Sequence, residues 1–258
     1  MKALAVSMVL VSDLMIAGIL VIVNAVGIDV SKFTETVSVH MPSWETLVLD
    51  DPTFGEVNWR LSELSNRTDD VIVVFLGKVL ERDGLFGMLK DSSEDYPNES
   101  SLKLSDLKRT FSRSRSLTLI LLTTNPVDVG TLRRIAWKGY NILYSRGMNL
   151  EPMTRGIRGE ADYNNDGIVD LRELAKNLSE KFISFVSENV SLSISEDELL
   201  RVAYTKIRKA VRDGTIGVKE ALKILELSLT GDWEDLKCVL LFASGGSNLS
   251  ELLGKIER

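Results

Sequence analysis

Short hydrophobic runs alternate with amphipathic segments through the middle of the chain. Four runs, rich in leucine and β-branched residues, are typical of strands: 46–49, 70–77, 116–124 and 140–144. Between them, hydrophobic positions at helical spacing predict three helices: 55–65, 105–112 and 131–137. This order predicts an α/β fold, a parallel Rossmann-like sheet with flanking helices.

The chain begins with its longest hydrophobic stretch. Residues 3–27 are almost all apolar and are long enough to cross a bilayer as a helix. Lys2 precedes the stretch, whereas Asp29 and Glu35 follow it. This charge bias predicts an N-terminal transmembrane anchor over residues 1–28, in the cell membrane, with the bulk of the chain extracytoplasmic. A cleaved signal peptide is the alternative, because Val23-Asn24-Ala25 has the spacing of a cleavage site.

Asp13 interrupts this hydrophobic stretch. A carboxylate in the middle of a bilayer costs about 2.5–3.5 kcal/mol on insertion scales. We expect Asp13 to contact a polar or basic group on the helix of a protein partner in a membrane complex. The alternative is a tolerated polar residue near the interface.

Composition bears on partners and compartment. The formal net charge is -6, and no run of Lys and Arg is interleaved with aromatic residues, which argues against nucleic acid as a partner. The absence of Gln suggests a heat-adapted source, although the many Asn residues argue against it. Five Asn-x-Ser/Thr sequons favour an extracytoplasmic glycoprotein: Asn66, Asn98, Asn177, Asn189 and Asn248.

Residues 162–173 meet every position of the calcium-loop pattern of EF-hands. Calcium takes six to eight oxygen ligands, and Gly167 stands at the sixth position, where the backbone turns sharply. We expect Ca²⁺ as a structural cofactor, held by Asp162, Asn164, Asp166, the backbone carbonyl of Ile168, Asp170 (directly or through a water) and Glu173. The alternative is an Asx-rich turn that caps the helix beginning near Leu171.

The flanks of this loop predict how it is held. Pro152, Gly156 and Gly159 precede it closely, so no entering helix is expected. Hydrophobic positions between Leu171 and Val186 predict an exiting helix. We therefore divide the chain into the anchor, an α/β domain over 29–190 and an entirely helical tail over 191–258.

The turn at residues 213–216 in the tail resembles the second half of a calcium loop. Its first and third ligand positions would be Lys209 and Val211, which cannot bind calcium. A plain helix–turn–helix is the simpler interpretation, and a vestigial loop is the alternative.

Nucleophilic catalysis usually needs a base beside the nucleophile. The chain has one histidine, His40, and one cysteine, Cys238, and neither lies in a sequence that resembles a site. A core or surface role is expected for both. A single cysteine also excludes an intrachain disulfide.

Three segments of the middle of the chain share a further pattern. The strand beginning Asp69-Asp70-Val71 ends in Leu76-Gly77-Lys78-Val79, and the next buried strand ends in Thr123-Thr124-Asn125-Pro126. The calcium loop lies within Ala161–Leu174. Together these segments, within residues 51–181, resemble the caspase–legumain–gingipain (clan CD) class of cysteine peptidases. Many members carry a similar dockerin-like calcium segment, and their two strands end in Ser-Gly-His-Gly and Asp-x-Cys-x-Ser-Gly.

The resemblance implies that Lys78 and Asn125 stand where the family has its catalytic His and Cys. An asparagine cannot act as a thiolate, so a catalytically degenerate, pseudo-peptidase subunit that binds or assembles is implied, with no catalytic residue. The family's first strand and helix are expected to be missing, with the anchor in their place. Three alternatives stay open: a generic Rossmann-like sheet carrying a calcium loop, a hydrolase with an unrecognised site, and a cell-surface interaction module.

Overall fold

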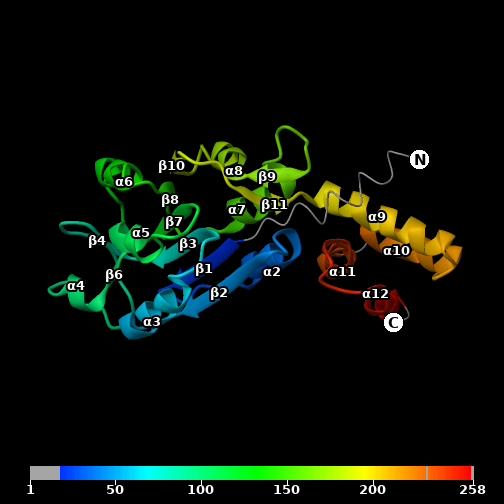
Figure 1. The fold of residues 1–258 in the computed structure, drawn as a ribbon, viewed down its shortest axis with the longest axis horizontal. Helices are drawn as coiled ribbons and strands as arrows, with labels where there is room; N and C mark the ends of the chain where they lie inside the picture. The colour runs from blue at the N-terminus through cyan, green and yellow to red at the C-terminus, as the bar shows by residue number, and fades with distance from the viewer. Residues whose placement is uncertain (1–17, 231, 257–258) are drawn as a thin grey trace.

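The computed structural model describes residues 18–230 and 232–256, and a six-stranded sheet lies at its centre (Figure 1). The strand order is β10-β8-β7-β3-β1-β2. Five strands run parallel: β1 (Gly18–Asn24), β2 (Trp44–Asp50), β3 (Asp70–Gly77), β7 (Leu117–Thr123) and β8 (Asn141–Arg146). The edge strand β10 (Ile183–Phe185) pairs antiparallel with β8. The expected mixed α/β fold with a mostly parallel sheet and flanking helices is therefore confirmed.

The predicted N-terminal transmembrane helix is wrong. Residues 18–24, the second part of the hydrophobic stretch, form β1, which is buried along its whole length between β2 and β3. A continuous run of branched apolar residues suits a strand buried on both faces as well as it suits a bilayer, so hydropathy alone cannot separate the two. None of the helices among the described residues combines the length and hydrophobicity of a membrane span. Asp13 lies outside the described residues.

β1 also changes two other expectations. Signal-peptide cleavage after Ala25 would remove this strand from between β3 and the edge strand β2. Helix α2 (Ser31–His40) follows β1, so a strand and a helix occupy the place where the anchor was expected.

Helices cover both faces of the sheet. Odd-numbered residues of β1, such as Ile19 and Val21, share a buried cluster with α3 (Phe54–Leu64), α5 (Leu107–Thr110) and α6 (Val129–Ala136). Even-numbered residues, such as Leu20 and Ile22, share a second cluster with α2, α7 (Glu151–Arg155), the π-helix η2 (Gly156–Glu160) and α8 (Leu171–Asn177). The alternation follows from the two-residue period of a strand.

Small elements join this framework. A three-stranded sheet follows β3 and contains β4 (Val79–Glu81), β5 (Leu85–Gly87) and β6 (Leu102–Lys103). The single turns α4 (Pro97–Ser100) and η1 (Leu104–Asp106) flank β6. A two-stranded sheet pairs β9 (Ile168–Asp170) with β11 (Ser191–Ile194).

Four helices build the tail: α9 (Glu196–Arg212), α10 (Val218–Thr230), α11 (Trp233–Ser244) and α12 (Leu249–Ile256). They form a third buried cluster, to which α2 contributes Val39. The tail is not entirely helical, because β11 precedes α9 and pairs with β9. Lys209 and Val211 lie inside α9, so residues 213–216 form a plain helix–turn–helix. Whether 29–190 and 191–258 fold as separate domains stays a prediction.

Candidate functional site

The predicted calcium loop, residues 162–173, connects η2 to α8 (Figure 1). Contrary to expectation, helical turns lead directly into it. Pro152 stands in the first turn of α7, where its missing N–H costs little. Gly159 adopts a φ of 129°, which ends the helical run just before the loop. On the other side, the exit helix α8 is shorter than predicted, because it ends at Asn177.

Asx-type hydrogen bonds close the first half of the loop. Asp162 Oδ2 accepts from the Gly167 N–H at 3.0 Å. Asn164 Oδ1 accepts from the Asp166 N–H at 2.8 Å, and Asp166 Oδ1 accepts from the Ile168 N–H at 2.9 Å. Gly167 adopts a φ of 87°, a conformation that glycine reaches without a Cβ clash. Three Asx side chains of the loop therefore accept hydrogen bonds from backbone N–H groups of the same loop.

The second half of the loop caps α8. Asp170 Oδ1 accepts from the Glu173 N–H at 2.9 Å, and Glu173 Oε2 accepts from the Asp170 N–H at 3.1 Å, which is a capping box. Asn189 Nδ2 donates to Asp170 Oδ2 at 2.7 Å. The alternative expectation, a turn that caps the following helix, is thus correct for the second half of the loop. Glu173 uses only Oε2 in this capping box, so its Oε1 atom takes no part in it.

The loop supplies oxygen atoms, which are the ligands that a hard cation such as Ca²⁺ prefers. One of these atoms also has the surroundings expected of a metal ligand. Asp162 Oδ1 is buried and has no hydrogen-bond partner, which is costly for a carboxylate oxygen unless a cation meets it. Both oxygens of Asp170 already have partners, so contact through a water suits this ninth position better than direct ligation. Within the described ranges, however, no three His, Cys, Asp or Glu side chains converge as a ready set of metal ligands. The calcium site stays a prediction.

The loop is tied to the tail and to α2. The Ser195 N–H donates to the Gly167 carbonyl at 2.9 Å, next to the β9–β11 pair. His40, at the end of α2, is buried and donates from Nδ1 to the Ile194 carbonyl at 2.9 Å. Burial lowers the pKa of His40 to about 4, while the Ile194 hydrogen bond and Glu196 act in the opposite direction and Arg158 adds to the lowering. The histidine is thus a buried core residue, one of the two roles that the sequence left open for it.

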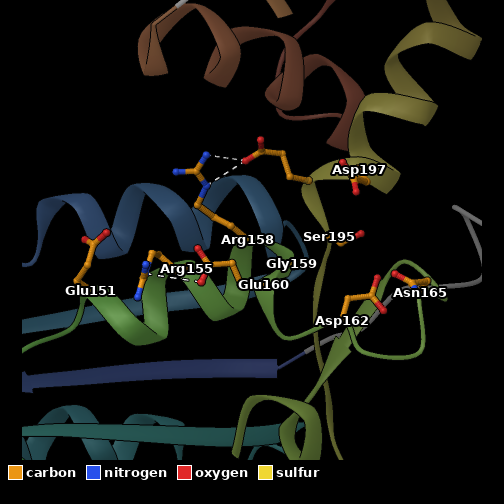
Figure 2. Close-up of a pocket in the computed structure, with 10 residues that line it drawn as sticks. Glu151, Arg155, Arg158, Gly159, Glu160, Asp162, Asn165, Ser195 and Asp197 are labelled. Atoms are coloured by element: carbon orange, nitrogen blue, oxygen red, sulfur yellow. Dashed lines mark hydrogen bonds and ion pairs between the residues drawn. The ribbon is translucent and has the colours of Figure 1, made fainter. Parts of the chain in front are cut away.

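A polar pocket of about 440 Å³ lies beside the loop (Figure 2). Arg158 forms two hydrogen bonds with Glu196, at 2.7 and 3.0 Å, and lies over the ring of Trp233 at 4.5 Å. The pocket is lined by Glu151, Arg155, Arg158, Gly159, Glu160, Asp162, Asn165, Ser195, Glu196 and Asp197. Sequence reasoning misses Arg158 and Glu196, because they lie in different elements and no local motif links them.

Figure 2 also places the loop relative to the strands. The arrow of β1 points away from Asp162 and Asn165, so the loop lies by the amino ends of the parallel strands. In such sheets ligands usually gather at the carboxyl ends of the strands instead. The difference arises because α7 and η2 carry the chain back along the sheet before the loop begins.

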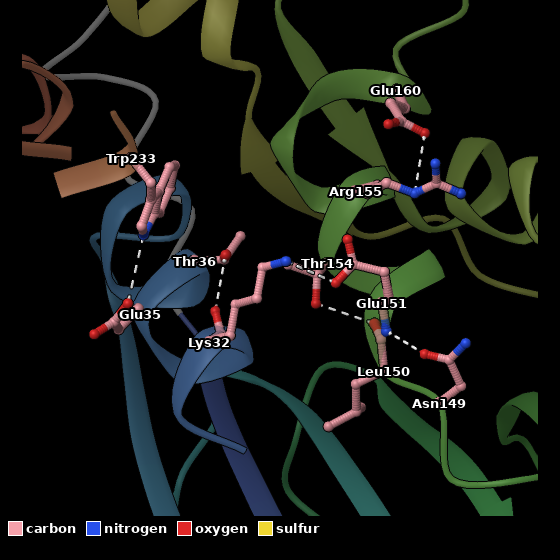
Figure 3. Close-up of polar contacts among 10 residues, drawn as sticks. All are labelled: Lys32, Glu35, Thr36, Asn149, Leu150, Glu151, Thr154, Arg155, Glu160 and Trp233. Carbon is pink, nitrogen blue, oxygen red and sulfur yellow. Dashed lines mark hydrogen bonds and ion pairs between the residues drawn. The ribbon is translucent and has the colours of Figure 1, made fainter. Parts of the chain in front are cut away.

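Polar contacts fasten α2 to its neighbours (Figure 3). Lys32 on α2 pairs with Glu151 on α7 at 2.9 Å. Glu35 accepts from the Trp233 indole N–H at 3.5 Å and pairs with Lys237 at 3.2 Å, both on α11. One helix therefore holds the segment before the loop and the helical tail together.

Lys78 follows β3 and Asn125 follows β7, two neighbouring parallel strands, so both residues lie at the carboxyl edge of the sheet. The Asn125 side chain accepts from the Val79 N–H at 2.9 Å and donates to the Val79 carbonyl at 2.8 Å. The Lys78 ammonium pairs with Glu94 on the surface, and this hydrogen bond lowers the pKa of Glu94. Cys238 donates its thiol to the Glu234 carbonyl at 3.1 Å, within its own helix.

Four of the five sequon asparagines are exposed: Asn66, Asn98, Asn189 and Asn248. Asn177 is half-buried and donates to the Glu160 carbonyl at 3.1 Å. Asn189 supports the calcium loop through Asp170, so a glycan there would compete with that contact. Glycosylation stays a prediction.

Comparisons with known proteins identify no family. No protein-family model and no curated protein matches the chain. Among solved structures, the crystal structure of drICE, a caspase, is similar at a TM-score of 0.43 and 12% identity, over 66% of this chain and 87% of that chain. Raptor from Chaetomium thermophilum is similar at a TM-score of 0.36 and 10% identity, over 89% of this chain, which spans only 24% of Raptor. With both TM-scores below 0.5, neither similarity supports an inference about activity.

Proposed function

We propose that this chain is a calcium-binding, non-catalytic protein with a caspase-like sheet, and that it acts by binding or assembly. The observation that carries the proposal is the pair of hydrogen bonds between the Asn125 side chain and the backbone of Val79. They fasten the segment after β7 to the first residue of β4, at the place where the resemblance implies a catalytic pair.

The chemistry of this edge favours a structural role. The Asn125 amide uses its oxygen and its nitrogen on one residue, Val79, and an amide is not a nucleophile. The Lys78 ammonium pairs with Glu94. The remaining thiol, on Cys238, is bonded within α11. Nucleophile and base are thus both replaced at the matched positions.

Calcium would act at the opposite edge of the sheet. Asp162, Asn164, Asp166, the Ile168 carbonyl and Glu173 would hold it, with Asp170 contributing through a water. The ion would neutralise the carboxylates of the loop. The loop is hydrogen-bonded to two neighbouring helical segments: the Gly167 carbonyl accepts from Ser195 ahead of α9, and Asp170 caps α8. Stabilising the loop would therefore also stabilise these connections. A structural ion at this position would fix the tail relative to the sheet.

A broad peptidase assay tests the proposal that the chain is non-catalytic. Purified protein should cleave none of a panel of fluorogenic peptides that vary the residue at the scissile bond, with or without calcium. Cys238→Ala and Asn125→Ala serve as matched controls for the thiol and for the strand-end site. Turnover by the native chain that disappears in either variant would contradict the proposal and identify the residue responsible.

A further inference from the structure

Helix α6 lies on the outside of the molecule, at the end away from the helical tail (Figure 1). Its inward positions are buried against the sheet: Thr131, Leu132 and Ile135. Its exposed positions and the two residues that follow the helix form one stripe at helical spacing: Val129, Gly130, Arg133, Arg134, Trp137 and Lys138. Trp137 is 80% exposed. An indole ring is therefore presented to solvent among three cations.

A second basic segment lies next to this stripe. The Lys108 N–H, in α5, donates to the Tyr140 hydroxyl at 2.6 Å, and the two segments lead into the neighbouring strands β7 and β8. Residues 107–115 and 129–140 contain four and three Lys or Arg residues, respectively, and no Asp or Glu. The whole chain has a formal net charge of -6. Positive charge is thus concentrated on this part of an acidic protein.

Most of these positive charges have no partner within the protein. Five of the side chains are exposed and form no ion pair with another residue in the ranges 18–230 and 232–256: Arg109, Arg113, Arg133, Arg134 and Lys138. Arg115 is different, because it pairs with Asp70. The acids that border the two segments are engaged elsewhere, since Asp106 pairs with Lys103 at 3.2 Å and Asp128 caps the start of α6.

A second exposed tryptophan has the opposite surroundings. Trp59 on α3 is 54% exposed, and Glu56 and Glu63 stand on the same side of that helix, three and four positions away. Arg60 lies over the Trp59 ring at 4.3 Å and pairs with Glu63 at 3.3 Å. Exposure of the indole is therefore common to both tryptophans, and the unpaired cations are particular to Trp137.

These features fit the surface of an anionic membrane. Anionic head groups attract nearby Lys and Arg side chains over about a Debye length, so a local cluster acts even on a negatively charged protein. Indole rings are enriched at the lipid–water interface, because they combine an apolar body with a polar N–H. A fluid lipid layer takes up a protruding ring without a preformed pocket, whereas a folded partner must match its shape.

We propose that the chain binds peripherally to anionic phospholipid membranes through this basic surface, which consists of Lys108, Arg109, Arg113, Arg133, Arg134, Trp137 and Lys138. Trp137 enters the interfacial layer, and the cations around it bind lipid phosphates and carboxylates. Such attachment lies on the membrane surface and is distinct from the spanning helix that the N-terminal hydrophobic stretch predicted. The inference goes beyond the proposed function and rests neither on the calcium loop nor on the absence of catalysis.

Co-sedimentation of the full chain with vesicles, in the presence of a chelator that removes any contribution of calcium, tests this attachment. The native chain should bind vesicles of phosphatidylcholine mixed with phosphatidylserine and should not bind phosphatidylcholine alone. Arg133→Gln/Arg134→Gln should weaken binding about 25-fold, since each cation near the surface contributes about fivefold. Arg208→Gln/Lys209→Gln is the matched control, because it removes the same charge from exposed positions of α9, and it should bind like the native chain.

Quenching of tryptophan fluorescence by brominated acyl chains reports whether the ring enters the lipid. Trp137→Phe should lose the quenching, whereas Trp59→Phe should keep it. Circular dichroism and melting establish that each variant is folded, which is expected for exposed positions.

Three results would overturn the proposal: a native chain that does not bind the mixed vesicles, an equal loss of binding in the two charge variants, or quenching that survives in Trp137→Phe. Tighter binding to a duplex oligonucleotide or to polyglutamate than to the vesicles would also overturn it, because the basic surface would then serve a different anionic partner.

Discussion

At the scale of single residues, buried polar side chains link elements that are far apart in sequence. His40 joins α2 to β11 through the Ile194 carbonyl, and Asn125, just after β7, joins that strand end to Val79, the first residue of β4. The residue types are visible in the sequence, but their partners are not, because each partner is a backbone atom of a distant segment. Burial rather than motif decides what both residues do.

Because His40 is buried, we predict that the folded chain loses stability in mild acid. Its pKa is about 4 in the folded chain, against about 6.5 when unfolded, so the unfolded state binds the extra proton between these values. The contribution of neutral His40 is fully present above about pH 6.5 and is lost as the pH falls towards 4. The full effect is roughly 3 kcal/mol of unfolding free energy.

Urea unfolding at several pH values, with His40→Asn beside the native chain, measures this contribution. Both chains share every other titratable group, so the difference between them isolates the histidine. The native chain should lose more stability than the variant between about pH 6.5 and pH 4.5. Parallel pH dependences in the two chains would contradict the prediction.

Two neighbouring residues at the carboxyl edge should differ sharply in their effect on stability. Asn125→Ala removes both hydrogen bonds to Val79 and should cost about 2 kcal/mol of unfolding free energy. Lys78→Ala breaks only an exposed ion pair and should cost less than about 1 kcal/mol. Urea unfolding distinguishes them, and equal costs would mean that Asn125 does not fasten β4 to the end of β7.

At the scale of elements, the sequence pattern predicts the type and the order of helices and strands more reliably than it predicts where each of them ends. The runs that became β3, β7 and β8 were recognised because buried parallel strands are nearly continuously apolar. The edge strand β2 was recognised only by its short apolar run at residues 46–49. β1 was misread because the hydrophobic run continues on its N-terminal side into residues 3–17. β10 was assigned to a helix because Phe182 and Ile183 continue the helical spacing of α8, although the helix ends at Asn177.

Two glycines in helical segments test how tightly elements pack. A Cβ on Gly156 would lie 2.5 Å from Leu174 Cδ1, where η2 meets α8, whereas a Cβ on Gly55 in α3 has nothing within 4 Å. Gly156→Ala should therefore destabilise the chain by about 1–3 kcal/mol through overpacking. Gly55→Ala should stabilise it by about 0.5–1 kcal/mol, because alanine loses less backbone entropy on folding.

Thermal melting of the two alanine variants beside the native chain makes the comparison. The substitution is the same in both, so only the surrounding space differs. Opposite shifts in melting temperature are expected. Shifts of the same sign would show that η2 and α8 are not closely packed at Gly156.

At the scale of the whole molecule, the candidate loop lies at a junction. Two buried clusters sandwich the sheet, and a third belongs to the helical tail. The loop connects to the segments that meet there: its strand β9 pairs with β11, the Gly167 carbonyl accepts from Ser195, and Asp170 caps α8. The sequence predicts the loop and its ligands from local spacing. Its place at the amino edge and the adjoining pocket depend on the path of α7 and η2, which spacing does not encode.

Melting the protein with calcium and after chelation tests the account most directly. Asp162, Asp166, Asp170 and Glu173 place four formal negative charges in one loop, so the ion should favour the folded state. At about a hundredfold excess over its Kd, calcium should add about 2.7 kcal/mol, which raises the melting temperature by about 5 °C. Glu173→Gln should lose most of this shift, and Glu220→Gln, outside the loop, should keep it. An identical melting temperature with calcium and with chelator in the native chain would contradict the account.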